Sequence, residues 1–232
     1  IKVEAEAFTD AYGNNNDASD VFKWTRDTTS PTIAITSSTS GVSNEKTTNN
    51  TTIDLTFTSS KVTTDFVVGD IKVSNGLLSD FDGSGNVYTA TFTPDRDGMC
   101  SIDVDAGKFT DAYGNKNTTV DQFTWTYDST SPKIAITSST SGVSNGNTTN
   151  DANISLKFSL SEAPKDDLTA DSITVTNGAL SKFFVKKDSD NKIYTATFTP
   201  DGDGVCTIKV EAEAFTDAYG NNNDASDVFK WT

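Results

Sequence analysis

Hydrophobic and polar positions alternate with a period of two along most of the chain, and clusters of Gly, Asn, Asp, Ser and Pro interrupt this alternation. A period of two is typical of β-strands with one buried face, and breaks at intervals of about eight to twelve residues are typical of a β-sandwich. In the C-terminal part of the chain, the pattern predicts strands at 133–138, 152–160, 172–176, 180–185, 192–199, 205–215 and 227–232. Seven short strands within about a hundred residues match the count of an immunoglobulin-like sandwich.

The same hundred-residue pattern occurs more than once in the chain. Residues 1–25 recur without a change at 208–232, and an imperfect copy occupies 102–126. Residues 27–57 return, with substitutions, at 128–158. We therefore predict two complete repeats, repeat one (26–127) and repeat two (128–232), preceded by the last two strands of another repeat at 1–25. This predicts that the chain is a piece of a longer one in which the two-repeat block recurs.

Four sequence motifs carry a resemblance to a known family. They are D-x-T-S-P-x-I-A-I, DSITVTNGALS at 171–181, YTATFTPDGDG at 194–204 and AFTDAYGN at 214–221. In this order and spacing the chain resembles the bacterial immunoglobulin-like domains strung in tandem in very large cell-surface and secreted adhesins. The resemblance implies an all-β fold of tandem immunoglobulin-like seven-stranded β-sandwiches, at the cell surface or outside the cell. It does not imply a particular adhesive target.

Cysteine and tryptophan are expected in the core. Cys100 and Cys206 occupy equivalent places, one in each repeat, on the inward phase of a strand. We interpret them as buried free thiols, with an intermolecular disulfide as the alternative. Trp24, Trp125 and Trp231 follow a Phe by two residues on the last strand, which favours core packing over a sugar-stacking platform.

Composition excludes several functions. The chain contains no His, so it lacks Ser-His-Asp and Cys-His machinery and His-ligated zinc or iron. A net charge of −15 repels nucleic acid and anionic lipid, and no apolar stretch reaches the roughly 18 residues of a membrane span. An enzyme is the least expected class, and cations are the expected counter-partners.

Carboxylate and amide oxygens are the remaining concentrated chemistry, and they are the ligands that Ca²⁺ prefers. In an immunoglobulin-like sandwich, the incoming linker and two of the loops lie at the same end. Repeat two would then bring together Asp128 of its linker, Glu162 of the S-E-A-P loop, and Asp217 and Asn221 of the T-D-A-Y-G-N loop. We predict a calcium site there, at the junction between the repeats.

Repeat one offers a weaker version of this site. Asp27, Asp111 and Asn115 are the equivalent candidate ligands, but Lys61 replaces Glu162, so these three residues could instead cap turns. The D-x-D-G turns at Asp95, Asp97 and at Asp201, Asp203 lie at the opposite end of each repeat, where we expect tight turns without a metal.

Three functions fit this sequence. The first is a spacer or stalk of a giant extracellular adhesin or surface fibre, whose partners are neighbouring repeats or adjacent fibre subunits. The second is a module that binds a glycan or a protein through the 184–192 loop, which distinguishes repeat two from repeat one. The third is a self-assembling filament subunit in which residues 1–25 exchange strands between chains, because an isolated hairpin is marginally stable in water.

Overall fold

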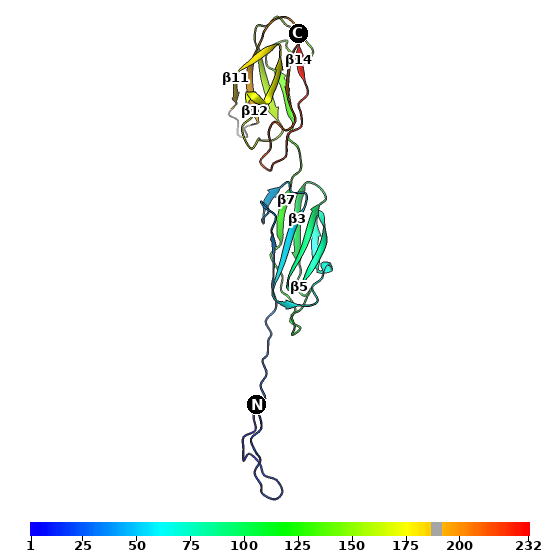
Figure 1. Ribbon diagram of the computed structural model, residues 1–232, viewed down its shortest axis with the longest axis vertical. Coiled ribbons are helices and arrows are strands. Elements are labelled where there is room, and N and C mark those ends of the chain that lie inside the picture. Colours follow the sequence, from blue (N-terminus) through cyan, green and yellow to red (C-terminus); the bar gives the residue numbers. More distant parts are fainter. Residues whose placement is uncertain (187–191) are drawn as a thin grey trace.

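The computed structural model describes residues 1–186 and 192–232, which form two β-sandwiches placed one after the other along the long axis of the molecule (Figure 1). Residues 1–25 lie beyond the N-terminal end of repeat one, and an extended segment joins the two parts. Two separate hydrophobic cores fill the sandwiches, one in each repeat. Within the described residues the chain is all-β apart from two single-turn 3-10 helices, η1 (Val68–Asp70) and η2 (Ala170–Ser172).

Repeat one contains a three-stranded sheet, β1-β3-β5, packed on a four-stranded sheet, β2-β7-β6-β4. The strands are β1 (Ile33–Ser37), β2 (Lys46–Thr48), β3 (Ile53–Thr63), β4 (Ile71–Ser74), β5 (Gly76–Pro94), β6 (Gly98–Val104) and β7 (Phe123–Tyr127).

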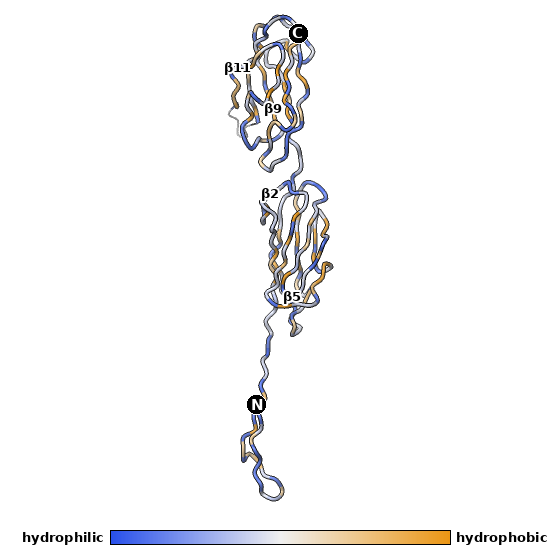
Figure 2. Tube along the Cα trace, in the orientation of Figure 1, coloured by the Kyte–Doolittle hydropathy of each residue, from blue (hydrophilic) through white to orange (hydrophobic). Residues whose placement is uncertain are grey.

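Repeat two contains the seven strands that the alternation predicts. They are β8 (Ile134–Ser138), β9 (Ile154–Leu160), β10 (Ile173–Thr176), β11 (Gly178–Val185), β12 (Ile193–Pro200), β13 (Cys206–Val210) and β14 (Phe229–Trp231). They form the sheets β11-β12-β9-β8 and β10-β13-β14. Apolar residues recur at every second position along these strands, which is visible as alternating colour along the trace (Figure 2).

Three predicted strands differ from those in the structure, one in repeat two and two in residues 1–25. The strand expected at 205–215 ends at Val210, because the chain turns at Glu211–Ala214 and Glu213 adopts a positive φ of 61°. Residues 1–25 contain turns and one isolated bridge, between Thr9 and Asn15, in place of two strands. The Ile208–Phe229 pair of repeat two has a counterpart here, two backbone hydrogen bonds of 2.8 Å between Ile1 and Phe22, but no strand extends from it.

The tryptophans and cysteines largely follow the prediction. Trp125 and Trp231 are buried to 1% and 2% exposure, and each packs edge-to-face on a Phe, at centroid distances of 4.7 Å and 4.8 Å. Cys100 and Cys206 are buried and free, and burial raises the pKa of both thiols. Trp24 is the exception: it is 65% exposed, since nothing covers it.

Candidate metal centre at the joint between the repeats

The T-D-A-Y-G-N loop of repeat two is organised around Asp217. Oδ1 of Asp217 accepts hydrogen bonds from the backbone N–H groups of Tyr219, at 2.8 Å, and Asn221, at 2.9 Å. Its Oδ2 accepts a third from Nδ2 of Asn221, also at 2.9 Å. Gly220 supplies the positive φ of 95° that closes the turn. Asp217 is therefore held in one orientation, although it is an acid with only 1% of its surface exposed.

The base of this loop is held by Asn223, which the sequence analysis did not single out. Asn223 is buried; its Oδ1 accepts the N–H of Phe215 at 2.9 Å, and its Nδ2 donates to the carbonyl of Glu211 at 2.9 Å. Asn117 makes the equivalent bonds to Phe109 and Asp105 in repeat one. The recurring Asn eight residues after a Phe was the available signal.

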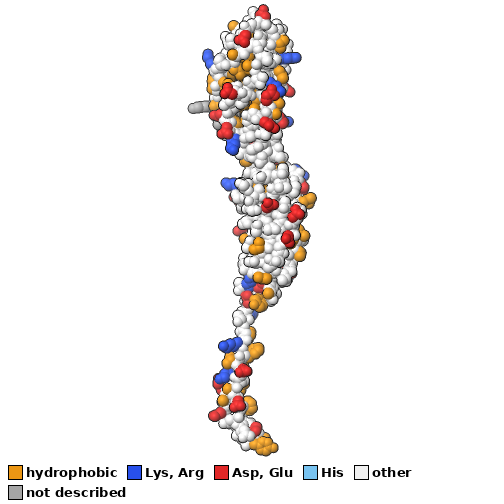
Figure 3. Space-filling model, in the orientation of Figure 1, with side chains coloured by type: hydrophobic (Ala, Val, Ile, Leu, Met, Phe, Trp, Pro, Cys, Tyr) orange, Lys and Arg blue, Asp and Glu red, His pale blue; other side chains and the backbone are white. Residues whose placement is uncertain are grey.

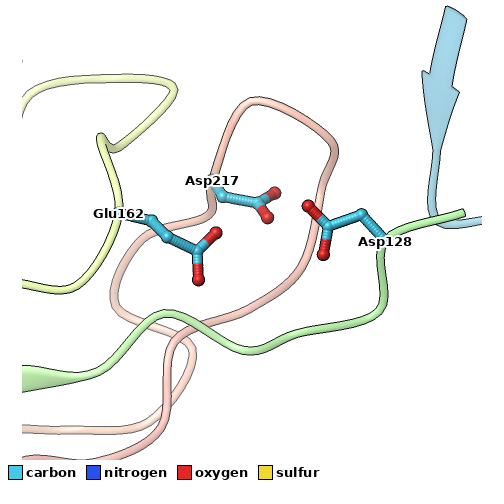
Figure 4. A group of neighbouring side chains, drawn as sticks. All are labelled: Asp128, Glu162 and Asp217. Carbon is cyan, nitrogen blue, oxygen red and sulfur yellow. The ribbon is translucent and has the colours of Figure 1, made fainter. Parts of the chain in front are cut away.

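Backbone contacts bring the three predicted carboxylates of repeat two together. An antiparallel bridge joins Pro164 to Asp217, which places the S-E-A-P loop against the T-D-A-Y-G-N loop. Asn221 donates from Nδ2 to the carbonyl of Asp128 at 3.0 Å, which ties the linker to the same loop. Carboxylate oxygens of Asp128, Glu162 and Asp217 all lie within 4.8 Å of one another and face a common centre (Figure 4).

The carboxylates of Asp128, Glu162 and Asp217 repel one another at these distances unless a cation lies between them. Burial, followed by repulsion from Asp128 and Asp217, raises the pKa of Glu162, and Lys192 offsets part of this rise. Asn221 differs from the three acids, because its side-chain nitrogen, a donor, faces Asp217 and the carbonyl of Asp128. In this geometry Asn221 holds Asp217 and Asp128 in position, and the three acids supply the oxygens at the centre of the cluster.

Repeat one places a lysine where repeat two has Glu162. Nζ of Lys61 lies 2.8 Å from Oδ2 of Asp27 and 2.8 Å from Oδ2 of Asp111, and it also donates to the carbonyl of Thr29. Asn115 braces Asp111 at 2.9 Å, just as Asn221 braces Asp217. Two of the three candidate ligands of repeat one, Asp27 and Asp111, therefore bind an ammonium group that belongs to the chain, and the third, Asn115, holds Asp111.

The joint also uses Asp97, for which the sequence analysis expected only a tight turn. This turn lies at the far end of repeat one, which is the end that faces repeat two. Oδ1 of Asp97 accepts hydrogen bonds from the N–H and Oγ of Ser129, at 2.8 Å and 2.7 Å. Its Oδ2 accepts one from Oγ1 of Thr130 at 2.5 Å. These bonds lower the pKa of Asp97, those from Thr130 and Ser129 most. Sequence reasoning missed this role because it placed the turn at the opposite end of repeat one and did not connect that end with the linker of repeat two.

The profile of the bacterial Ig-like domain family matches residues 27–127 and again 128–231. The chain belongs to this family. Comparison of the sequence with curated proteins gave no match. The two matched segments meet at Asp128, so the joint described above is the boundary between two tandem bacterial Ig-like domains.

Several solved structures of bacterial proteins are similar to this chain. The C-terminal domain of the Streptococcus agalactiae AgI/II polypeptide BspA is 10% identical, with a TM-score of 0.41, over 87% of this chain and 99% of that one. Yersinia pseudotuberculosis InvD is 16% identical, with a TM-score of 0.33, over 88% of this chain and 56% of that one. The C-terminal domain of the Streptococcus pyogenes protein AspA is 9% identical, with a TM-score of 0.36, over 88% and 99%.

Among residues 1–186 and 192–232, no helix has the length and apolar character needed to cross a membrane. Most of the 184–192 loop, considered above for glycan or protein binding, lies outside the described residues, namely 187–191.

Proposed function

We propose that this chain is a non-enzymatic spacer, a segment of a stalk in which bacterial Ig-like domains follow one another end to end outside the cell. The observation that carries this proposal is the joint between the repeats. The linker at this joint, residues 127–132, is hydrogen-bonded to both repeats; we call it the second linker, the first being residues 26–31 before repeat one. The N–H of Asp128 donates to the carbonyl of Thr48 at 3.0 Å on the side of repeat one, and Asn221 holds the carbonyl of Asp128 on the side of repeat two. A linker bonded to both neighbours restricts bending, which is the property a spacer needs.

The dimensions of the sandwiches suit this role. Strand β3, in the middle of its sheet in repeat one, has 11 residues. At about 3.3 Å per residue this corresponds to roughly 36 Å, so a two-repeat block advances the chain on the order of 80 Å with its linkers. Acidic side chains are scattered over the surfaces of both repeats (Figure 3). Their like charge discourages lateral association between stalks.

For the joint between the repeats we propose Ca²⁺ as the stiffening ion, held by Asp128, Glu162 and Asp217. Two oxygens bound to one Ca²⁺ at about 2.4 Å lie at most about 4.8 Å apart, and the three carboxylates satisfy this limit. The donor set consists only of hard oxygens, which favours Ca²⁺ over softer metals. Extracellular modules bind this ion at about 10⁻⁴ to 10⁻³ M, a range suited to the proposed location.

Lys61 supports this assignment from within the same chain. At the corresponding position of repeat one, the charge between the acids is neutralised by a lysine, which implies that the acids of repeat two also need a positive partner. We therefore propose calcium at repeat two alone. Joints of the two types would alternate along a stalk built from this block, with calcium at every second joint.

A calorimetric comparison tests the proposed calcium site. In about 10 mM Ca²⁺, repeat two should unfold several degrees higher than in chelator, since calcium at 100 times a Kd of about 10⁻⁴ M adds about 2.7 kcal/mol. Repeat one should unfold at the same temperature in both buffers, and Glu162→Gln should remove most of the effect. Identical transitions for repeat two in calcium and in chelator would refute the calcium site.

The spacer role has a separate test in the shape of the molecule. Small-angle scattering in calcium should give a maximum dimension that corresponds to repeats held end to end. A distribution of strongly bent shapes in calcium would refute a stiff spacer, whatever the melting curves show.

Strand exchange is a second candidate function, favoured by the exposure of residues 1–25. Phe22 and Trp24 are 66% and 65% exposed, whereas their copies Phe229 and Trp231 are buried at 5% and 2%. The loop around Asp10 is already formed, with Asn14 bonded to Oδ2 at 2.9 Å as Asn221 is to Asp217. For this second candidate we propose that residues 1–25 are completed by a copy of residues 128–207 in a neighbouring chain.

A further inference from the structure

The end of repeat two that points away from repeat one carries a hollow of about 570 Å³. Its lining comes from two segments, the 148–152 loop and the D-G-D-G turn with its flanks, together with the C-terminal residues. In repeat one, the equivalent end receives the second linker. The hollow therefore occupies the place where repeat one binds the start of the domain that follows it.

The turns at the two ends have the same geometry. Gly98 and Gly204 close them with φ values of 130° and 129°. A neighbouring Asn braces each turn in the same way: Asn75 donates to the carbonyl of Arg96 at 2.8 Å, and Asn177 donates to that of Gly202 at 3.2 Å. Asp203 therefore stands where Asp97 stands in repeat one. Asp203 is exposed, whereas Asp97 accepts hydrogen bonds from Ser129 and Thr130.

Other contacts of the joint also have counterparts around the hollow. In repeat one, the carbonyl of Thr48 accepts the N–H of Asp128, and Asn49 lies beside Gly220, where a side chain would come within 3.4 Å of it. Thr149 and Asn150 occupy these positions in repeat two, and both line the hollow. The residues of repeat one that contact the second linker thus have counterparts around the hollow of repeat two.

The chain itself contains a segment of matching chemistry. Residues 1–25 are identical to residues 208–232. The first linker (26–31) follows Trp24-Thr25, and a linker attached beside the hollow would follow the identical pair Trp231-Thr232. Thr28 and Thr29 occupy the places of Ser129 and Thr130, and each carries a hydroxyl group. The N–H of Thr29 donates to Asp27 at 2.9 Å, as that of Thr130 does to Asp128 at 3.1 Å, so the two linkers begin with the same turn.

From this equivalence we infer that the hollow is a docking socket for the linker of a following repeat of the type of repeat one. Asp203 accepts hydrogen bonds from the N–H and hydroxyl of a Thr28-type residue and from the hydroxyl of a Thr29-type residue. The carbonyl of Thr149 accepts the N–H of an Asp27-type residue. This rests on the proposed spacer function and adds a second kind of joint, in which Lys61 supplies the cation and Asp203 fixes the linker.

The test adds a second copy of residues 26–127 directly after Thr232 of the full chain. Cysteines introduced at Thr174 of repeat two and at Ser74 of the added repeat, both exposed, carry spin labels whose distance distribution is measured. The native cysteines are buried and stay unlabelled. For the parent chain we expect a narrow distance distribution. Asp203→Asn should broaden this distribution at least twofold. Asp201→Asn, which removes the same charge from the same turn, should not broaden it.

Changes on the other side of the joint give an independent reading. Thr28→Val and Thr29→Val together, in the added copy, should broaden the distribution as Asp203→Asn does, and both variants should keep the unfolding transitions of the parent. Equal widths for the parent, Asp203→Asn and the double Thr variant would overturn the socket.

Failure of the socket can be distinguished from failure of the spacer. The joint from repeat one to repeat two is measured in parallel, with labels at Ser74 of the original copy and Thr174. A narrow distribution there, with a broad one at the added joint, overturns the socket alone. Broad distributions at both joints overturn the spacer as well. Chelator should leave the added joint unchanged, because Lys61 stands there in place of Glu162.

Discussion

Lys61 in repeat one and Glu162 in repeat two occupy the same place in their domains but carry opposite charges. The ammonium of Lys61 lies 2.8 Å from the carboxylates of both Asp27 and Asp111. Glu162 instead adds a third carboxylate to the equivalent pair, Asp128 and Asp217. One scaffold thus offers two ways to neutralise a pair of acids at a domain joint, one with a side chain and the other with the ion proposed above.

Replacing Glu162 with Lys should convert repeat two to the type of repeat one. The new ammonium would lie between Asp128 and Asp217, so repeat two should unfold at a higher temperature than the parent when both are in chelator. Its transition should no longer respond to Ca²⁺, which calorimetry with and without calcium would show. The matched control is Glu162→Gln, which removes the charge without adding a cation. A calcium response that survives in Glu162→Lys would contradict the assignment of Glu162 as a ligand.

The ion pairs of Lys61 make the stability of repeat one sensitive to acid. Burial disfavours ionisation of Asp111, but hydrogen bonds from Lys61 and Asn115 outweigh it and hold the pKa of Asp111 far below its ordinary 3.8. The hydrogen bond from Lys61 also lowers the pKa of Asp27. Because both folded pKa values lie below the unfolded ones, this stabilisation is complete above about pH 3.8 and is lost as the pH falls further.

We therefore expect repeat one to keep its stability from pH 7 to about pH 4 and to lose it below, as followed by NMR, which resolves the two repeats. In Lys61→Gln the folded pKa values of Asp27 and Asp111 rise toward their unfolded values, so the loss of stability below about pH 4 should be smaller than in the parent. An equally large loss in parent and variant would show that the ion pairs do not govern the acid response.

Residues 1–25 should restore a domain that lacks its last two strands. A chain of residues 26–207 leaves the core of repeat two uncovered at Phe198, which packs on Trp231 in the intact domain. Adding a peptide of residues 1–25 should restore the second unfolding transition and shift the emission of Trp24 to the blue as it becomes buried. A peptide with Phe22→Asp and Trp24→Asp is the control. No difference between the two peptides would rule out strand exchange.

The sequence predicted the local features of this molecule better than its joints. Strands such as Ile154–Leu160 follow from alternation alone, because a period of two places every second side chain in the core. The meeting of Asp128, Glu162 and Asp217 also followed from the sequence, once the sandwich topology fixed which loops share an end. Asp97 was missed because its partners, Ser129 and Thr130, belong to the next domain, and no period within one repeat reports a contact between repeats.

The role of Asn221 gives a last prediction, which separates a brace from a ligand. Its Nδ2 donates to both Oδ2 of Asp217 and the carbonyl of Asp128, so it positions two members of the cluster without lending it an oxygen. Residues that orient metal ligands change affinity by about 10- to 100-fold when they are removed. We expect Asn221→Ala to weaken calcium binding by about this factor, measured by isothermal titration. Asn115→Ala, the matched change in repeat one, should lower the unfolding temperature of that repeat and leave calcium affinity unchanged. An unchanged affinity in Asn221→Ala would show that the backbone bonds from Tyr219 and Asn221 are sufficient to orient Asp217.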